Sequence, residues 1–114
     1  MGKTILVIDD STSLRQVVRM SLEGAGYNVL EAGDGMAALA LLDGRQIHMA
    51  ICDVNMPKLD GISFVKQAKQ LPAYRFLPVL MLTTESSEEK KQAGKAAGAK
   101  AWMLKPFAPS SMLA

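Results

Sequence analysis

Four short apolar segments of this 114-residue chain each run into polar residues that could carry out phosphoryl chemistry. In chain order those residues are Asp9 with Asp10, Asp53, Thr83 and Lys105. Neighbouring carboxylates repel one another unless a cation neutralises them, and hard divalent ions such as Mg²⁺ prefer oxygen ligands. A carboxylate beside such an ion can attack phosphorus to form an acyl phosphate, while a hydroxyl and an ammonium can hold the phosphoryl oxygens. If these side chains meet, they predict a divalent-cation site beside a nucleophile.

Strands of a parallel sheet would bring these residues together. Short, continuous apolar segments are typical of parallel strands that helices cover on both faces. Every strand of such a sheet ends at the same edge, so residues that follow different strands converge there. The expected strands are 4–8, 28–31, 49–52, 78–82 and 101–104.

Helical signals separate the expected strands. The spacing of apolar residues predicts a helix over 12–24, and Asp34 is a suitable N-cap for a second helix. A third helix follows the polar connection 54–61. Ser86 and Glu89 have the spacing of a capping box, which predicts the start of a fourth helix.

A fifth helix is expected to begin near Pro109, which suits the first turn of a helix. The chain ends barely one turn later, so we expect this last helix to be truncated. The alternation of strands and helices predicts an α/β fold, a doubly wound five-stranded parallel sheet with helices on both faces. We expect residues 1–114 to form a single domain of this kind.

The composition excludes several classes of protein. The net charge of +2 is too small to indicate direct binding of nucleic acid. Cys52 is the single cysteine, so it cannot close an intrachain disulfide, and its apolar surroundings predict a small core residue. No apolar segment approaches the length of a membrane span, and the N-terminus has no signal-peptide pattern. We therefore expect a cytoplasmic protein that does not insert into membranes.

The motifs around the polar residues resemble the receiver domain of two-component response regulators. They are Asp9-Asp10, Asp53 followed by Met56-Pro57 and Asp60-Gly61, Leu82-Thr83, and Lys105-Pro106-Phe107. Within that family, segments 9–15 and 53–57 are most similar to the stand-alone chemotaxis regulators of the CheY type. The resemblance covers essentially the whole chain and implies a flavodoxin-like sheet with the strand order 2-1-3-4-5.

The resemblance implies a role for each residue of the site. Asp53 would accept the phosphoryl group from a phosphohistidine on a sensor histidine kinase. Asp10, Asp53 and the backbone carbonyl of Asn55 would bind Mg²⁺, with Asp9 acting through a metal-bound water. Lys105 would pair with the phosphoryl group, and its peptide bond to the following proline is expected to be cis.

The resemblance also implies a conformational switch. Thr83 would move to hydrogen-bond the phosphoryl group, and Thr84 is the alternative hydroxyl. Asn55 and Glu85 would modulate water access, and both match the pattern associated with rapid loss of the phosphoryl group. Trp102 occupies a position that is usually Tyr, Phe or His in the family, and two interpretations of it stay open. It is either a switch residue that moves with Thr83 or a fixed aromatic residue packed against the fourth helix.

The expected function is a phosphorylation-dependent signalling switch that controls chemotaxis or motility. It would catalyse only its own phosphorylation and dephosphorylation, and in that sense it would not be an enzyme. The implied partners are a sensor histidine kinase (CheA-like), an output target such as a flagellar motor component, and a phosphatase. We expect a monomer.

Other functions share parts of this pattern. The site residues do not distinguish a chemotaxis output protein from a phosphate sink or from the receiver module of a longer regulator or hybrid kinase. A flavin-binding flavodoxin would share the fold, but Asp9 and Asp10 would repel the flavin phosphate. A phosphatase of the haloacid dehalogenase type needs an Asp-x-Asp motif on the first strand, and that spacing is absent.

Overall fold

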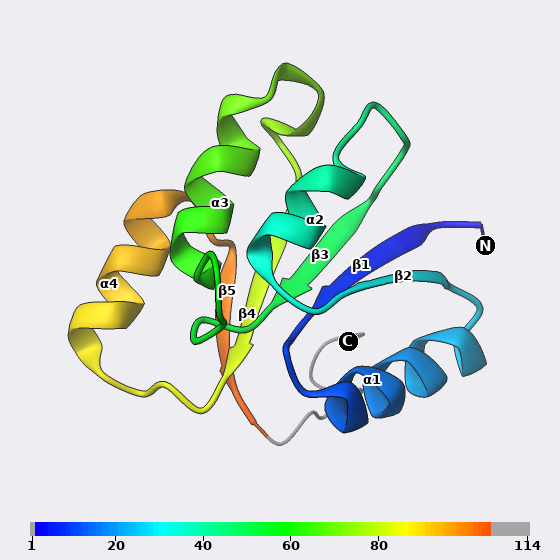
Figure 1. The fold of residues 1–114 in the computed structure, drawn as a ribbon, viewed down its shortest axis with the longest axis horizontal. Coiled ribbons are helices and arrows are strands. Elements are labelled where there is room, and N and C mark those ends of the chain that lie inside the picture. The colour runs from blue at the N-terminus through cyan, green and yellow to red at the C-terminus, as the bar shows by residue number, and fades with distance from the viewer. Residues whose placement is uncertain (1, 106–114) are drawn as a thin grey trace.

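The computed structural model describes residues 2–105 of the chain (Figure 1). The expected fifth helix near Pro109, the peptide bond between Lys105 and Pro106, and Phe107 lie outside the described residues. Helices lie on both sides of a central sheet, which confirms the predicted α/β architecture.

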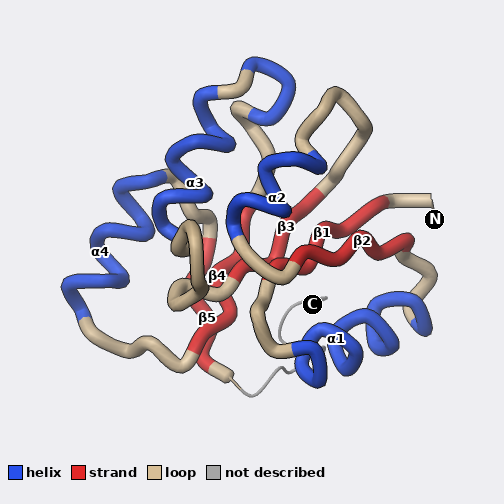
Figure 2. Tube along the Cα trace, in the orientation of Figure 1, coloured by secondary structure: helices blue, strands red, loops and turns tan. Residues whose placement is uncertain are grey.

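Five parallel strands form one sheet in the order β2-β1-β3-β4-β5, as expected (Figure 2). The strands are β1 (Thr4–Ile8), β2 (Asn28–Ala32), β3 (Met49–Cys52), β4 (Val79–Thr83) and β5 (Ala101–Leu104). Strand β4 begins one residue later than predicted, because Pro78 has no N–H to donate to a neighbouring strand. The backbone carbonyl of Pro78 still accepts a hydrogen bond from Ala50 N at 3.0 Å.

The helices are α1 (Thr12–Gly24), α2 (Gly35–Leu41), α3 (Gly61–Gln70) and α4 (Glu88–Ala97), with a short 3₁₀ helix η1 (Pro72–Tyr74). Helix α1 has the predicted bounds, and η1 was not predicted. Side-chain oxygens of Ser11, Asp34, Asp60 and Ser87 cap the four α-helices at their N-termini. Among the described residues, no helix is long and apolar enough to cross a membrane.

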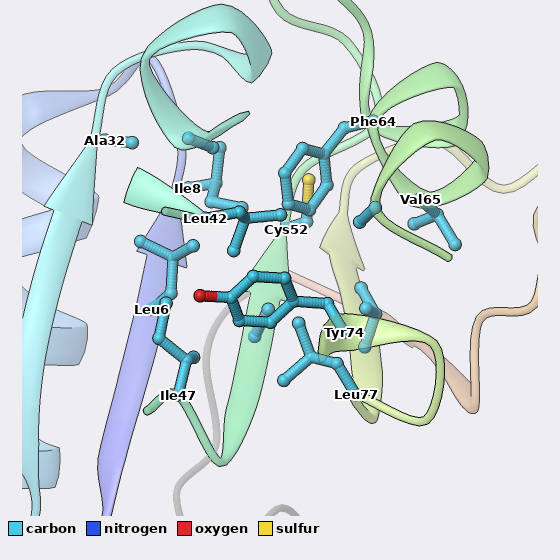
Figure 3. Packing of buried hydrophobic residues seen from close by; sticks show 14 of the residues in the cluster. Leu6, Ile8, Ala32, Leu42, Ile47, Cys52, Phe64, Val65, Tyr74 and Leu77 are labelled. Atoms are coloured by element: carbon cyan, nitrogen blue, oxygen red, sulfur yellow. The ribbon is translucent and has the colours of Figure 1, made fainter. Parts of the chain in front are cut away.

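The sheet buries a separate apolar cluster on each face, because successive side chains of a strand point to opposite faces. Leu6 and Ile8 of β1 belong to the cluster under α2 and α3, which Figure 3 shows. Ile5 and Val7 belong to the cluster under α1. Cys52 is fully buried in the first cluster, so the prediction of a core cysteine is confirmed, and burial raises the pKa of its thiol.

The prediction of the start of α4 was wrong by one residue. Ser87, not Ser86, is the N-cap, and its hydroxyl accepts a hydrogen bond from Lys90 N at 3.2 Å. The carboxylate of Glu85 accepts a hydrogen bond from Ser87 N at 3.2 Å. Helix α4 therefore begins one residue later than the capping-box pattern predicts. Glu89 therefore does not occupy the reciprocal position of a capping box.

Candidate functional site

The four apolar segments end at one edge of the sheet, as the sequence predicts. Asp9 and Asp53 directly follow β1 and β3, which are neighbours in the sheet. Thr83 ends β4, and its backbone carbonyl accepts a hydrogen bond from Lys105 N at 3.0 Å. Asp9 and Asp53 are only 3% and 6% exposed, and Thr83 is fully buried. The fold therefore places two carboxylates and a hydroxyl at an edge of the sheet where they are almost inaccessible to solvent. Charge interactions are stronger there than in water.

Lys105 joins the two buried acids. Its Nζ lies 3.0 Å from Asp53 Oδ2 and 3.0 Å from Asp9 Oδ2. Partial burial lowers the pKa of Lys105, but its hydrogen bonds to Asp53 and Asp9 outweigh this effect, and the pKa is raised overall. Lys105 is therefore a cation that bridges two buried carboxyl groups.

The acidic side chains at this edge fit a divalent cation. Carboxylate oxygens of Asp9, Asp10 and Asp53 lie within 4.8 Å of one another. Burial raises the pKa of Asp9, and the N–H of Ser11 and the ammonium of Lys105 only partly offset this effect. One lysine does not balance three carboxylates, so the cluster carries excess negative charge on hard oxygen donors. These are the properties that Mg²⁺ requires.

The backbone after β3 fixes the Asp53 side chain. Val54 N donates a hydrogen bond to Asp53 Oδ1 at 2.7 Å, while Oδ2 faces Lys105. Gly61 N donates to Val54 O at 2.8 Å and brings the start of α3 against the strand end. A Cβ at Gly61 would lie 2.0 Å from Asp53 O, so only glycine permits this approach.

The loop between Asp53 and α3 contains a strained turn. Leu59 N donates to Pro57 O at 2.7 Å, which closes a three-residue turn around Lys58. Lys58 has a φ of 68°, and within residues 2–105 it is the one non-glycine residue with a positive φ. Such a γ-turn is a rare and strained conformation, and here it lies in the loop that follows the candidate nucleophile, Asp53.

A chain of hydrogen bonds connects Thr83 with Trp102. Glu85 N donates to Thr83 Oγ1 at 3.1 Å, and Trp102 Nε1 donates to Glu85 O at 3.0 Å. The indole also packs against α4, where a Cβ at Gly94 would lie 2.7 Å from Trp102 Cζ3. The packing against α4 that one interpretation of Trp102 predicts is therefore present, together with a hydrogen-bonded connection to Thr83 that the other interpretation needs.

The remaining predicted residues lie beside this edge. Asn55 is exposed two residues after Asp53, and Glu85 is partly buried after β4. Hydrogen bonds from Ser87, and a further one from Asn55, lower the pKa of Glu85. Thr84 is exposed, so the buried Thr83 is the better placed hydroxyl.

Sequence reasoning gave no role to three residues that the structure places at or near the site. Gly61 and Gly94 permit close approaches to Asp53 and Trp102. Arg15 donates a hydrogen bond from Nη1 to the backbone carbonyl of Asp9. Gly61 and Arg15 belong to segments that resemble the receiver family. Their roles depend on contacts between different elements of the fold, which the sequence does not show.

Comparisons with known proteins agree with this geometry. A protein-family model described as "Response regulator receiver domain" matches residues 5–114. The alkaline phosphatase synthesis transcriptional regulatory protein PhoP of Bacillus subtilis is 40% identical over 109 residues, which are 96% of this chain and 45% of that protein. The phosphate regulon transcriptional regulatory protein PhoB of Pseudomonas aeruginosa is 33% identical over 114 residues, 100% of this chain and 50% of that protein. The chain thus spans about half the length of these relatives.

A solved structure matches along nearly its full length. The chemotaxis protein CheY4 of Vibrio cholerae is 48% identical and superposes with a TM-score of 0.93. The match covers 99% of this chain and 94% of that chain.

Proposed function

The chain belongs to the response regulator receiver domain family, and we therefore propose that it is a phosphorylation-dependent switch in which Asp53 accepts the phosphoryl group. The observation that carries this proposal is the position of Asp53. Its carboxylate is buried at the strand edge, lies 3.0 Å from Lys105 Nζ, and lies within 4.8 Å of the carboxylates of Asp9 and Asp10.

The transfer would take place from a phosphohistidine on a sensor histidine kinase. An Asp53 carboxylate oxygen attacks phosphorus, a P–O bond forms, the P–N bond breaks, and the released imidazole takes up a proton. Lys105 balances the negative charge of the transferred group, since its ammonium already faces Asp53 Oδ2. Val54 N keeps the carboxylate oriented throughout.

Bound Mg²⁺ would supply further charge stabilisation to the phosphoryl oxygens. Asp10, Asp53 and the backbone carbonyl of Asn55 would hold the ion, and Asp9 would act through a bound water. The excess of carboxylates over lysines in the cluster supports this assignment.

Hydrolysis would reset the switch. Water attacks phosphorus, the bond between phosphorus and the Asp53 oxygen breaks, and inorganic phosphate leaves. Asn55 lies two residues after Asp53, and its side chain hydrogen-bonds to Glu85, which supports a role for both residues in governing water access. We propose rapid loss of the phosphoryl group and no catalysis beyond the protein's own phosphorylation and dephosphorylation.

Phosphorylation would change the connection between Thr83 and Trp102. Thr83 Oγ1 now accepts the N–H of Glu85, and a hydroxyl that turns towards a phosphoryl oxygen gives up that position. Glu85 O holds the Trp102 indole, so a shift of residue 85 changes the contact between Trp102 and α4. This relation supports Trp102 as a second switch residue, with α4 and β5 as the surface that changes.

Chemotaxis or motility control in the cytoplasm is the output that we propose. The similarity to CheY4 over nearly the full length of both chains supports it. The kinase would then be CheA-like and the target a flagellar motor component, with a phosphatase assisting the reset. The second candidate is the receiver module of a longer transcriptional regulator, which the half-length matches to PhoP and PhoB favour.

Intact mass spectrometry with a small phosphodonor tests the acceptor. Wild-type protein incubated with Mg²⁺ and acetyl phosphate should gain one phosphoryl group, and Asp53→Asn should gain none. Asp43→Asn is the matched control, because Asp43 is exposed and pairs with the nearby Arg45. Equal labelling of the wild type and Asp53→Asn would refute the assignment, and a phosphoryl half-life of hours would refute rapid resetting.

A further inference from the structure

An arginine contacts the backbone of the acidic pair that follows β1. Arg15 lies in the first turn of α1, and its Nη1 donates a hydrogen bond to the backbone carbonyl of Asp9. Its Nε lies 3.2 Å from Oε1 of Glu31, the last residue but one of strand β2. The Arg15 side chain is only 17% exposed, so the guanidinium is fixed between two strand ends.

The carbonyl that Arg15 holds belongs to the peptide bond between Asp9 and Asp10. The orientation of this peptide sets the direction in which the Asp10 side chain leaves the backbone. The Asp9 carboxylate is held independently, by Ser11 N at 2.8 Å and by Lys105 at 3.0 Å. Within residues 2–105, no hydrogen bond or ion pair holds the Asp10 carboxylate. The orientation of this side chain therefore depends on the backbone of Asp10.

We propose that Arg15 is a positioning residue that raises the affinity of the acidic cluster for Mg²⁺ by orienting Asp10. This inference rests on the proposed function for the identity of the ion. Groups that orient metal ligands without touching the metal commonly contribute about 10-fold to metal affinity. Glu31 supports the arrangement by holding the guanidinium from its other side.

The sign of the effect separates positioning from simple electrostatics. Arg15 carries a positive charge near a cation site, so charge repulsion alone predicts that its removal tightens Mg²⁺ binding. Loss of positioning predicts the reverse. Arg19 is the matched control, because its Nη1 also pairs with Glu31, at 2.7 Å, while within residues 2–105 it has no hydrogen bond to Asp9.

Isothermal titration calorimetry with Mg²⁺ on the unphosphorylated protein provides the test. Arg15→Gln should raise the dissociation constant about 10-fold, whereas Arg19→Gln should stay close to wild type or bind slightly tighter. Arg15→Lys keeps the charge but cannot hold the carbonyl and Glu31 together in the same fork, so it should resemble Arg15→Gln. Thermal unfolding in EDTA verifies that each variant is folded, and Arg15→Lys serves alone if Arg15→Gln does not fold.

An unchanged or lowered dissociation constant in the folded Arg15 variant would overturn the inference. In phosphorylation assays, the Mg²⁺ concentration for half-maximal labelling should rise in the Arg15 variant while the rate at saturating Mg²⁺ stays near wild type. A wild type that binds Mg²⁺ in an Arg15-dependent manner but takes no phosphoryl group would refute the acceptor role of Asp53 and leave this inference standing. Normal labelling of Asp53 together with Mg²⁺ binding that does not depend on Arg15 would refute this inference and leave the acceptor role of Asp53 standing.

Discussion

Replacing Gly61 with alanine should destabilise the protein, although alanine is the better helix former. Gly61 is the first residue of α3, and a Cβ there would lie 2.0 Å from the backbone oxygen of Asp53 and 2.9 Å from its carbonyl carbon. Ordinary van der Waals contact begins near 3.4 Å, so the strand end and the helix must separate by about 1.4 Å. The obstacle is backbone, which cannot rotate aside as a side chain would.

The expected loss follows from two opposing effects. Helix propensity favours alanine over glycine by about 1 kcal/mol. Overpacking of a close contact costs about 1–3 kcal/mol, and we expect about 3 kcal/mol here because the contact is with buried backbone. The net change in the free energy of unfolding should be a loss of about 2 kcal/mol. Because the displaced group is the Asp53 peptide, phosphorylation with acetyl phosphate should also slow.

Urea unfolding followed by circular dichroism measures the first effect, and intact mass over time measures the second. Gly24→Ala is the control, since Gly24 ends α1 and a Cβ there would meet nothing within 4 Å. That variant should equal the wild type or gain up to about 1 kcal/mol. A Gly61→Ala protein with wild-type stability and wild-type labelling would refute the claim that this approach requires glycine.

Three further predictions concern the site and its surroundings. Gly94→Ala puts a Cβ 2.7 Å from the Trp102 ring, so the indole should leave α4 and its fluorescence emission should shift to longer wavelength. Burial raises the pKa of Asp9, which means that its charged carboxylate costs folding free energy. Asp9→Asn should therefore increase the urea midpoint in EDTA, while the stabilisation by Mg²⁺ should be lost. A lower midpoint in EDTA would contradict this prediction. The pKa of Lys105 is raised in the folded state, so its contribution to stability is full below about pH 10.4 and declines as pH rises through the folded pKa. The difference in unfolding free energy between wild type and Lys105→Met should therefore be constant at neutral pH and shrink in alkali; a difference that grows in alkali would refute the direction of the shift.

The sheet could be predicted from the sequence because four of its five strands are largely apolar segments that run into a polar residue. The convergence of Asp9, Asp53 and Lys105 followed from that arrangement, since parallel strands share one edge. The start of α4 could not be predicted in the same way. Two adjacent serines offer the same local chemistry, and only the contact of Glu85 with the second one selects it.

The residues that make the close approaches between elements could not be predicted from the sequence. Packing of Trp102 against the fourth helix was one of two interpretations, but nothing in the local pattern identifies Gly94 as the residue that lies against the indole. The contact between Arg15 and the Asp9 carbonyl is similar, since it depends on the angle at which α1 leaves the sheet. Such contacts adjust the geometry of the site, whereas the strand pattern predicts only its position.

For the proposed switch, the distance along the chain between Asp53 and Lys105 has a practical consequence. Lys105 and Asp53 are 52 positions apart in sequence and meet only when β3, β4 and β5 are paired. An unfolded or partly folded molecule has no ammonium beside the aspartate, so it should take no phosphoryl group. Labelling stoichiometry at saturation is then a direct count of correctly folded molecules, and it can serve as an active-site titration for preparations of this protein and its variants.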